Sequence, residues 1–160
     1  MSLPPIAHEL LVDTAPAPAF ELFAERIGDW WPLGYTFSRT GFASAEIEPR
    51  AGGRWFERTL AGAELPWGEV RVYEPARRLV LGFGISPERR PTPPDAASEV
   101  EVTFTAVDPG RTRVRVEHRA FERHGDGAAR LREGMDSDEG WPLILAEFRR
   151  ETRSVRQIAR

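Results

Sequence analysis

The chain has 160 residues and a formal net charge of −3, with 41% hydrophobic and 29% charged residues. This length and composition are typical of one globular domain, expected to span residues 1–160, and they exclude an intrinsically disordered chain. Because binding to a polyanion needs a clustered surplus of basic residues, the acidic balance also argues against nucleic acid as a partner.

The N-terminal region predicts a strand followed by a helix. The segment IAHELLVDT (6–14) has strand character, and Pro16 marks a helix start capped by Asp13 or Thr14. Apolar residues then recur at helical spacing, in a stripe formed by Phe20, Phe23, Ala24 and Ile27. Gly28 is predicted to end this helix. The N-terminus has no basic segment followed by a long apolar run, so no secretory signal is indicated and a cytoplasmic location is expected.

The segment RIGDWWPLGYTFSRT (26–40) puts a large aromatic surface directly after the predicted helix. Trp30 and Trp31 each bring a wide apolar area and an indole N–H, while Pro32 favours extended geometry at Trp31. Such a corner has to be covered, either by protein alone or by protein together with a ligand.

Between residues 43 and 122 the apolar period changes to two, which predicts six consecutive strands of an antiparallel meander with one solvated face. With the N-terminal strand the sheet has seven. Val70 and Val72 are predicted to share one face, and the turn DPGR (108–111) to join the last two strands. Further inward positions are predicted at Leu79, Leu81, Phe83, Ile85, Val100, Val102, Phe104, Ala106, Val114, Val116 and His118.

Two loops and a long helix complete the chain. Residues 86–97 are rich in proline and charge and predict a projecting connection, while residues 123–140 are rich in glycine and charge and predict a mobile loop. The C-terminal helix is predicted over residues 139–158, with an apolar side formed by Trp141, Ile144, Leu145, Phe148, Thr152 and Val155. A solvated surface that complements the helix dipole is predicted for Arg149, Arg150, Arg153, Arg156 and Arg160.

A long amphipathic helix that follows a curved antiparallel sheet must lie across the apolar face of that sheet. The sequence therefore predicts an α+β fold in which a six- to seven-stranded sheet wraps around the C-terminal helix. The apolar side of the helix and the inward strand residues then enclose whatever space remains between them.

Five stretches carry a resemblance to a known family: FELFAERIGDWWP, EPRAGGRWFER, WGEVRVYEPARRLVLGF, VEVTFTAVDPGRTRVRVEH and EGWPLILAEF. In this order they resemble the SRPBCC, or START-like, superfamily, and more narrowly the family named for the activator of heat-shock-protein 90 ATPase. The resemblance covers nearly the whole chain. It implies a helix-grip fold with a cavity between sheet and C-terminal helix, used for hydrophobic ligands and occasionally for cyclase or dehydratase chemistry. The eukaryotic co-chaperone has an additional N-terminal domain for which this chain has no room, so chaperone activation carries over only weakly.

Two ionisable residues are weak candidates for catalysis. If Trp55 and Glu57 point inward from their strand, Glu57 is a carboxylate in an aromatic cavity and suits proton transfer. If the opposite face points inward, Glu57 forms an ion pair on the outer face with an arginine such as Arg71. His118 is in register with inward residues, so it is either an acid/base or ligand-contacting group, or a core histidine whose hydrogen bonds are satisfied.

The residues expected to face the cavity form the predicted ligand site. They are Trp30, Trp31, Trp55, Phe56, Trp67, Val70, Leu81, Phe83, Phe104, Val116, Trp141, Leu145 and Phe148. Core packing alone explains any single one of these tryptophans. Several near the ends of elements are harder to explain in that way, because an apolar pocket with a few polar groups is also the composition of a small-molecule site.

Nothing in the sequence predicts a cofactor or a metal. The chain has no cysteine and no lysine, which excludes disulfides, thiolate ligands and Schiff-base chemistry. His8, His118 and His124 have no metal-ligand spacing, and GFGISP (82–87) lacks the third glycine and the following helix of a dinucleotide motif. No stretch approaches the roughly 20 apolar residues of a membrane span. A homodimer is compatible with a domain this small, although no residue indicates one.

Three functional hypotheses follow. The leading one is a module that binds a small hydrophobic molecule, aromatic or lipid-like, between the sheet and the C-terminal helix. The second is a cyclase- or dehydratase-type enzyme that uses Glu57, His118 or an arginine in the same cavity, which requires at least two such groups to converge on one pocket. The third is an interaction module related to chaperone regulation or to a stress response.

Overall fold

The computed structural model describes residues 2–158, with side chains described up to residue 155. Within this range the strands are β1 (Ile6–Val12), β2 (Phe42–Ile47), β3 (Arg54–Thr59), β4 (Glu64–Glu74), β5 (Arg78–Phe83), β6 (Ser98–Asp108) and β7 (Arg111–Arg119). The α-helices are α1 (Pro16–Glu25), α2 (Ile27–Trp30), α3 (Ala128–Asp136) and α4 (Trp141–Ile158). Short 3-10 turns occupy Leu33–Tyr35, Arg39–Gly41, Pro94–Ala96 and Phe121–His124.

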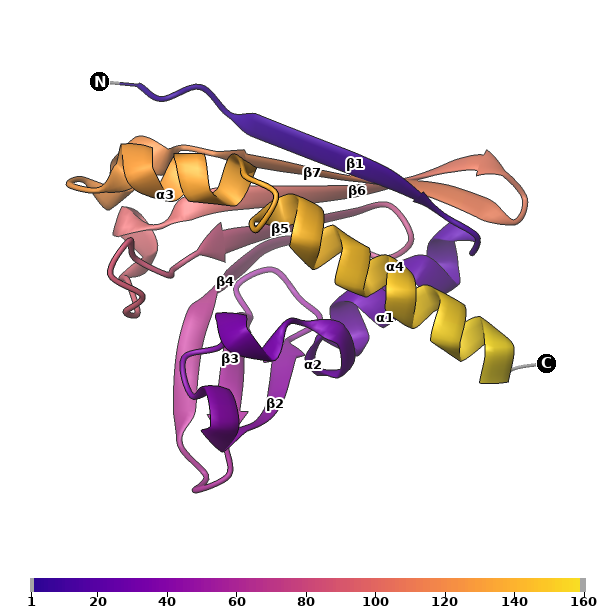
Figure 1. Cartoon of the computed structure of the whole chain (residues 1–160), viewed down its shortest axis with the longest axis horizontal. Coiled ribbons are helices and arrows are strands. Elements are labelled where there is room, and N and C mark those ends of the chain that lie inside the picture. The colour runs from indigo at the N-terminus through magenta and orange to yellow at the C-terminus, as the bar shows by residue number, and fades with distance from the viewer. Residues whose placement is uncertain (1, 159–160) are drawn as a thin grey trace.

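The strands form one antiparallel sheet of seven in the order β1-β7-β6-β5-β4-β3-β2. The sheet is curled, because β2, β3 and the adjoining end of β4 turn away from the plane of the other strands, and α4 runs across its concave side (Figure 1). The predicted α+β helix-grip fold is confirmed: β2 to β7 form the six-stranded meander, and β1 adds the seventh strand beside β7. No helix in the described part of the chain is long and apolar enough to cross a membrane.

The helical region before the tryptophan corner differs from the prediction at both ends. Helix α1 begins at Pro16 as predicted, but its N-cap is Ala15 without a side-chain hydrogen bond, so the predicted cap by Asp13 or Thr14 is wrong. The break falls at Arg26, and Gly28 lies inside α2 rather than ending a helix. A Cβ atom at Gly28 would lie 2.8 Å from the backbone nitrogen of Ala45 in β2, so this glycine permits close contact between helix and strand.

A register shift in β4 changes which residues face the core. Val70 pairs with Leu81 and is buried in the core, whereas Val72 pairs with Val80 on the other face of the sheet. The prediction that Val70 and Val72 share a face is therefore wrong. The extra residue of a β-bulge reverses the alternation, so Tyr73 rather than Val72 packs against the core.

The segment predicted as a mobile loop contains helix α3. Gly127 precedes the helix with a φ of 86°, a left-handed conformation that favours glycine. Leu131 and Met135 are one helical turn apart, and both pack against the core. Residues 123–140 are rich in charged residues and glycine, so the helical spacing of two apolar residues was not enough to indicate a helix.

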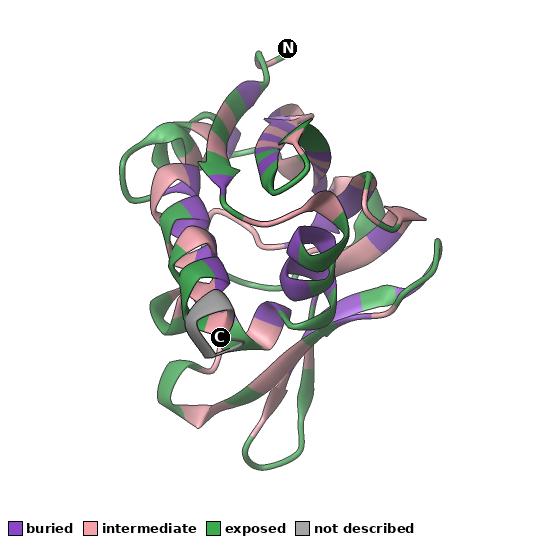
Figure 2. Ribbon diagram, turned by 90° about the vertical axis from the view of Figure 1, so that its right-hand side faces the viewer, coloured by how far each residue is buried: buried purple, intermediate pink, exposed green. Residues whose placement is uncertain are grey.

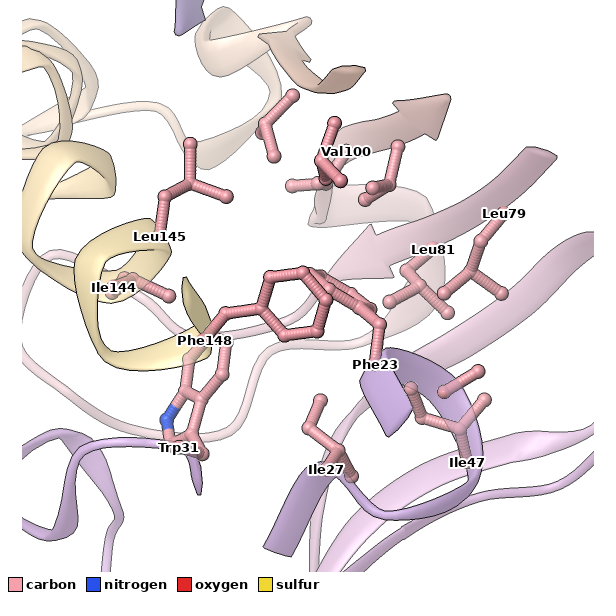
Figure 3. Packing of buried hydrophobic residues seen from close by; sticks show 14 of the residues in the cluster. Phe23, Ile27, Trp31, Ile47, Leu79, Leu81, Val100, Ile144, Leu145 and Phe148 are labelled. Carbon is pink, nitrogen blue, oxygen red and sulfur yellow. The ribbon is translucent and has the colours of Figure 1, made fainter. Parts of the chain in front are cut away.

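Helix α4 presents its apolar side to the sheet as predicted. Trp141, Ile144, Leu145, Phe148 and Thr152 are buried, and on the ribbon of α4 buried and exposed bands alternate (Figure 2). Around Phe148 the rings interlock: Phe23 contacts Phe148 edge-on at 5.2 Å between centroids (Figure 3). The predicted solvated surface holds for Arg150 and Arg153, which are exposed, and Arg149 is half-buried, while the side chains of Arg156 and Arg160 lie outside the described part of the chain.

Candidate functional site

The tryptophan corner closes one end of the space between the sheet and α4. Trp31 is the centre of a ring cluster, with centroid distances of 5.3 Å to Trp67, 5.9 Å to Trp55 and 6.2 Å to Trp141. Its indole Nε1 donates to the backbone oxygen of Tyr35 at 3.3 Å. Most of the aromatic surface at this corner is thus covered by protein, and one side of Trp31 borders a cleft.

A cleft of about 380 Å³ lies beside Trp31. Its walls come from the segment after α2, the β5–β6 loop, α3 and the start of α4. The apolar part is formed by Trp31, Tyr35, Phe37, Phe83, Ile85, Pro87, Leu131, Met135 and Ile144. Figure 3 shows Ile144 on α4 above the indole of Trp31. The deepest of these residues, Trp31, Phe83 and Ile144, are buried, so the cleft ends on the core.

Exposed polar residues line the mouth of the cleft. Arg89 comes from the β5–β6 loop, Arg130 from α3, and Ser137 and Glu139 from the turn before α4. The Tyr35 hydroxyl donates to the backbone oxygen of Glu139 at 2.5 Å, which joins the segment after α2 to the start of α4. The cleft therefore combines an apolar floor with a polar, mainly cationic mouth.

Glu57 points inward, as the first reading of its strand proposed, but its carboxylate is fully engaged. Oε1 accepts from the Phe37 N–H at 2.6 Å and from Trp67 Nε1 at 2.7 Å. Oε2 accepts from the Ser38 N–H at 3.0 Å and from the Ser38 hydroxyl. Glu57 is buried and does not line the cleft, so it fastens the segment that follows the tryptophan corner to the sheet.

The alternative ion pair between Glu57 and Arg71 is absent among the described residues. Arg71 lies on the outer face and pairs with Glu99 at 2.9 Å. Arg119 also pairs with Glu99, at 2.7 Å, and with Glu101 at 2.6 Å. Side-chain hydrogen bonds to Arg119 and Arg71 hold the pKa of Glu99 below its ordinary value against the opposing effect of burial. The outer face of the sheet thus carries a network of ion pairs between strands, and Glu57, on the inner face, is not part of it.

His118 is a core histidine with both ring nitrogens engaged. Trp141 Nε1 can only donate, so His118 Nδ1 accepts its hydrogen bond at 3.0 Å. His118 Nε2 therefore carries the proton and donates to Ser98 Oγ at 2.8 Å. Burial, with a smaller contribution from nearby His124, holds the pKa of His118 well below its ordinary value of 6.5. The imidazole is neutral at physiological pH.

The chain of hydrogen bonds continues to His124, for which the sequence carries no signal beyond the absence of metal-ligand spacing. His124 Nε2 accepts from the Ser98 N–H at 3.1 Å and from the Ser98 hydroxyl at 2.8 Å. Its proton is then on Nδ1, which is buried without a hydrogen-bond partner in the described part of the chain. Burial lowers the pKa of His124, and the charge of Glu88 opposes this. No spacing signal links Ser98 to either histidine, because register and a loop bring them together.

The structure brings only part of the predicted ligand site to the cleft. Trp31 and Phe83 line it. Phe56 lies on the opposite face of β3, where the guanidinium groups of Arg54 and Arg58 cover its ring at 4.2 and 5.4 Å, so its assignment to the cavity is corrected. Contact with a ligand stays a prediction for the remaining residues, which are buried in the core: Trp30, Trp55, Trp67, Val70, Leu81, Phe104, Val116, Trp141, Leu145 and Phe148.

Most residues of the cleft wall were not predicted from the sequence. Tyr35 and Phe37 directly follow the WWP corner, and their aromatic character was the available signal. Leu131 and Met135 have helical i, i+4 spacing inside the segment predicted as a loop. Arg89 and Arg130 gave no signal, since an isolated arginine in a polar loop is usually a solvated side chain.

Residues 14–152 match the family described as Activator of Hsp90 ATPase homolog 1-like protein. The chain belongs to this family. The match covers most of the chain and confirms the resemblance drawn from the sequence. A comparison with curated proteins gives no match.

Solved structures extend the likeness. CalC, a self-sacrificing resistance protein from Micromonospora echinospora, is 34% identical over 94% of this chain and 95% of its own, with a TM-score of 0.67. The anthrahydroquino-gamma-pyrone synthase Txn09 is 32% identical over 93% of this chain and 97% of its own, with a TM-score of 0.64. The di-domain ARO/CYC BexL of the BE-7585A biosynthetic pathway shares the fold at 22% identity and a TM-score of 0.60, over 92% of this chain and 46% of its own.

Proposed function

We propose that the protein binds a small hydrophobic molecule with an aromatic ring system in the cleft beside Trp31. The observation that carries the proposal is a cleft of about 380 Å³ whose floor is built from aromatic and aliphatic side chains. Clefts of roughly 300–1,000 Å³ with apolar walls and a few polar groups are the usual form of small-molecule sites. Binding there removes apolar ligand surface from water at about 25 cal/mol per Å².

The relatives support an aromatic ligand. Txn09 is by its name a synthase of an anthrahydroquino-gamma-pyrone, a fused aromatic product, and it covers nearly the whole chain at 32% identity. The rings of Trp31, Tyr35, Phe37 and Phe83 at the cleft offer faces and edges for stacking with such a molecule. Aromatic rings in the wall favour a planar ligand over a flexible acyl chain.

Catalysis of the cyclase or dehydratase type in the same cleft has weaker support. It requires two acid/base groups that converge on the ligand. Glu57 and His118 are absent from the cleft wall as the structure describes it, and both are saturated by hydrogen bonds. The likeness to Txn09 favours the hypothesis. Chaperone regulation is supported only by the family to which the chain belongs.

A cleft-filling substitution tests the proposed binding. Gly134 of α3 lines the cleft, and a Cβ atom added there has no heavy atom within 4 Å. Gly134→Leu should therefore fill space in the cleft while favouring the helix by about 0.5–1 kcal/mol. Glu133→Leu, exposed on the same helix and not part of the cleft wall, is the matched control.

The probe is N-phenyl-1-naphthylamine, a neutral aromatic dye that fluoresces in apolar surroundings. We expect its emission to rise with the wild-type protein and tryptophan emission to fall, since Trp31 borders the cleft. Gly134→Leu should weaken binding by about tenfold, equivalent to about 1.4 kcal/mol, with no loss of thermal stability. Glu133→Leu should bind as the wild type does. Absence of binding, or equal binding by all three proteins, contradicts the proposal.

A further inference from the structure

We propose that the ligand of the cleft carries an anionic group beside its ring system, as an aromatic carboxylate, sulfonate or acidic phenol does. This inference rests on the proposed function and concerns the same site. It is carried by two arginines, Arg89 and Arg130, that line the mouth of the cleft from separate elements.

Neither cleft arginine has a hydrogen-bond or ion-pair partner for its guanidinium group among the described side chains, which end at residue 155. The sheet surface shows the contrast. Arg71, Arg78 and Arg119 there are held by carboxylates of Glu99 and Glu101. The chain has more acidic than basic residues, yet these two arginines at the mouth of one cleft have no carboxylate partner among the described side chains. The N–H donors of their guanidinium groups are therefore available to bind a ligand.

Local structure places the two arginines together. A turn fixes Arg89, because the Ser86 N–H donates to the Arg90 oxygen at 2.9 Å and the Arg89 N–H to the Ser86 oxygen at 2.8 Å. The start of α3 lies against the same loop. A Cβ atom at Gly127 would be 3.0 Å from Pro87 Cβ and 3.3 Å from Arg130 Nη2. Arg130 thus approaches the loop that carries Arg89.

The opposing charge at the mouth comes from Glu139, which also lines the cleft. Glu139 belongs to the turn before α4, and its backbone oxygen is held by Tyr35. Glu88 neighbours Arg89 in the loop and is exposed, but it is not part of the cleft wall. An anionic group is therefore stabilised on the side of the loop and α3, and repelled on the side of α4.

The apolar floor and the cationic mouth together define an amphiphilic ligand. Its rings would lie against Trp31 and Phe83, and its anionic group would reach the guanidinium groups. Arginine suits this role because its planar donor group matches two oxygens of a carboxylate or sulfonate. A neutral aromatic molecule would fill the floor and leave both guanidinium groups to water.

Two dyes with the same ring system distinguish the contribution of the anionic group to binding from that of the rings. N-phenyl-1-naphthylamine is neutral, and 1-anilinonaphthalene-8-sulfonate adds one sulfonate to the same scaffold. Both are titrated into the wild type, Arg130→Gln, Arg89→Gln and Arg153→Gln. Arg153 is exposed on α4, outside the cleft wall, and is the matched control.

We expect the sulfonate dye to bind the wild type more tightly than the neutral dye, with the difference reduced as salt screens the charges. Arg130→Gln should weaken the sulfonate dye by about tenfold, the scale of one charge-assisted hydrogen bond, and Arg89→Gln by about threefold or more. Binding of the neutral dye should change little in any variant. Arg153→Gln should bind both dyes as the wild type does.

The outcomes distinguish the two proposals. If both dyes bind equally and neither cleft arginine matters, the anion inference fails while the proposed binding function holds. If an effect appears equally in Arg153→Gln, the sulfonate responds to general surface charge and the inference also fails. If neither dye binds, or if Gly134→Leu leaves both unaffected, the cleft is not the site and both proposals fail.

Discussion

The inner side of the sheet has two ends that are built from the same kinds of residue but differ in how they are covered. At one end, α1 and α4 press Phe20, Phe23, Phe104 and Phe148 into edge-on contacts with centroid distances between 5.2 and 5.8 Å. At the other end, Trp31 borders a cleft of about 380 Å³. The first end is a filled core and the second is a partly filled one.

The covering elements account for the difference. The filled end is covered by the ten-residue α1 and the eighteen-residue α4, whose apolar stripes are continuous. The cleft end is covered by short turns, the β5–β6 loop and the nine-residue α3, which carries only Leu131 and Met135 toward the core. Short, polar elements cannot supply enough side-chain volume to fill the space. We infer that stability is concentrated at one end and binding at the other.

Side-chain truncation, once at the filled end and once at the cleft end, should give the largest difference between these two roles. Phe148→Ala should lower the free energy of unfolding by about 3–5 kcal/mol, because a fully buried ring leaves a cavity. Leu131→Ala, at the half-buried cleft wall, should cost no more than about 1.5 kcal/mol and change dye binding instead. Urea denaturation with dye titration measures both. Equal losses of stability at the two ends would remove the distinction.

Glu57 should stabilise the cleft end of the protein, because its carboxylate holds residues 37 and 38 by hydrogen bonds. Glu57→Gln replaces one acceptor oxygen by a donor amide facing N–H and O–H groups, and should cost about 2–3 kcal/mol. Hydrogen exchange at the Phe37 and Ser38 amides should accelerate more than exchange in α1. Unchanged exchange at these amides would show that another contact fixes the segment.

The pH dependence of stability should reveal the neutral state of His118. Its pKa is held well below 6.5 in the folded protein, so the unfolded chain binds the extra proton first as pH falls. Stability is thus full above pH 6.5 and should fall by about 1.4 kcal/mol between pH 7.5 and 5.5, with a further loss from His124. Denaturation of the wild type and His118→Gln across this window is the test. A slope unchanged in the variant would assign the effect elsewhere.

The smallest expected effect is at the bridge over the cleft. Tyr35→Phe removes the hydrogen bond to the Glu139 oxygen and should cost about 0.5–1 kcal/mol, because water can replace the lost partner. The half-saturation concentration of the neutral dye should change less than about threefold, since the ring stays in the wall. A larger stability loss than at Leu131 would show that the bridge, rather than side-chain packing, defines this end.

The long elements could be predicted from the sequence and the short ones could not. The apolar stripe of α4 and the alternation in β5, β6 and β7 extend over enough residues to determine both period and face. In β4 a single bulge reversed the face of Val72, and a bulge has no signature in an apolar alternation. Helix α3 was not predicted because only two of its nine residues have large apolar side chains.

The candidate site depends on contacts between segments that are distant in the sequence. Glu57 is 20 residues from Phe37, and His118 is 20 residues from Ser98, so their hydrogen bonds follow from strand register and loop position. Alternation predicted the inward direction of His118 but left that of Glu57 open, and the saturation of both side chains by donors and acceptors could not be predicted. The cleft itself is a space left by packing, which no local pattern encodes.

The most direct test of the account is the response of the five tryptophan indole N–H signals to ligand, measured by ¹H–¹⁵N NMR during a titration with N-phenyl-1-naphthylamine. Of the five tryptophans, all of which the structure describes, Trp31 alone lines the cleft, so its signal should move most, followed by smaller shifts at its ring neighbours Trp67, Trp55 and Trp141. A largest shift at Trp30, or five unchanged signals at saturating dye, would contradict binding in this cleft.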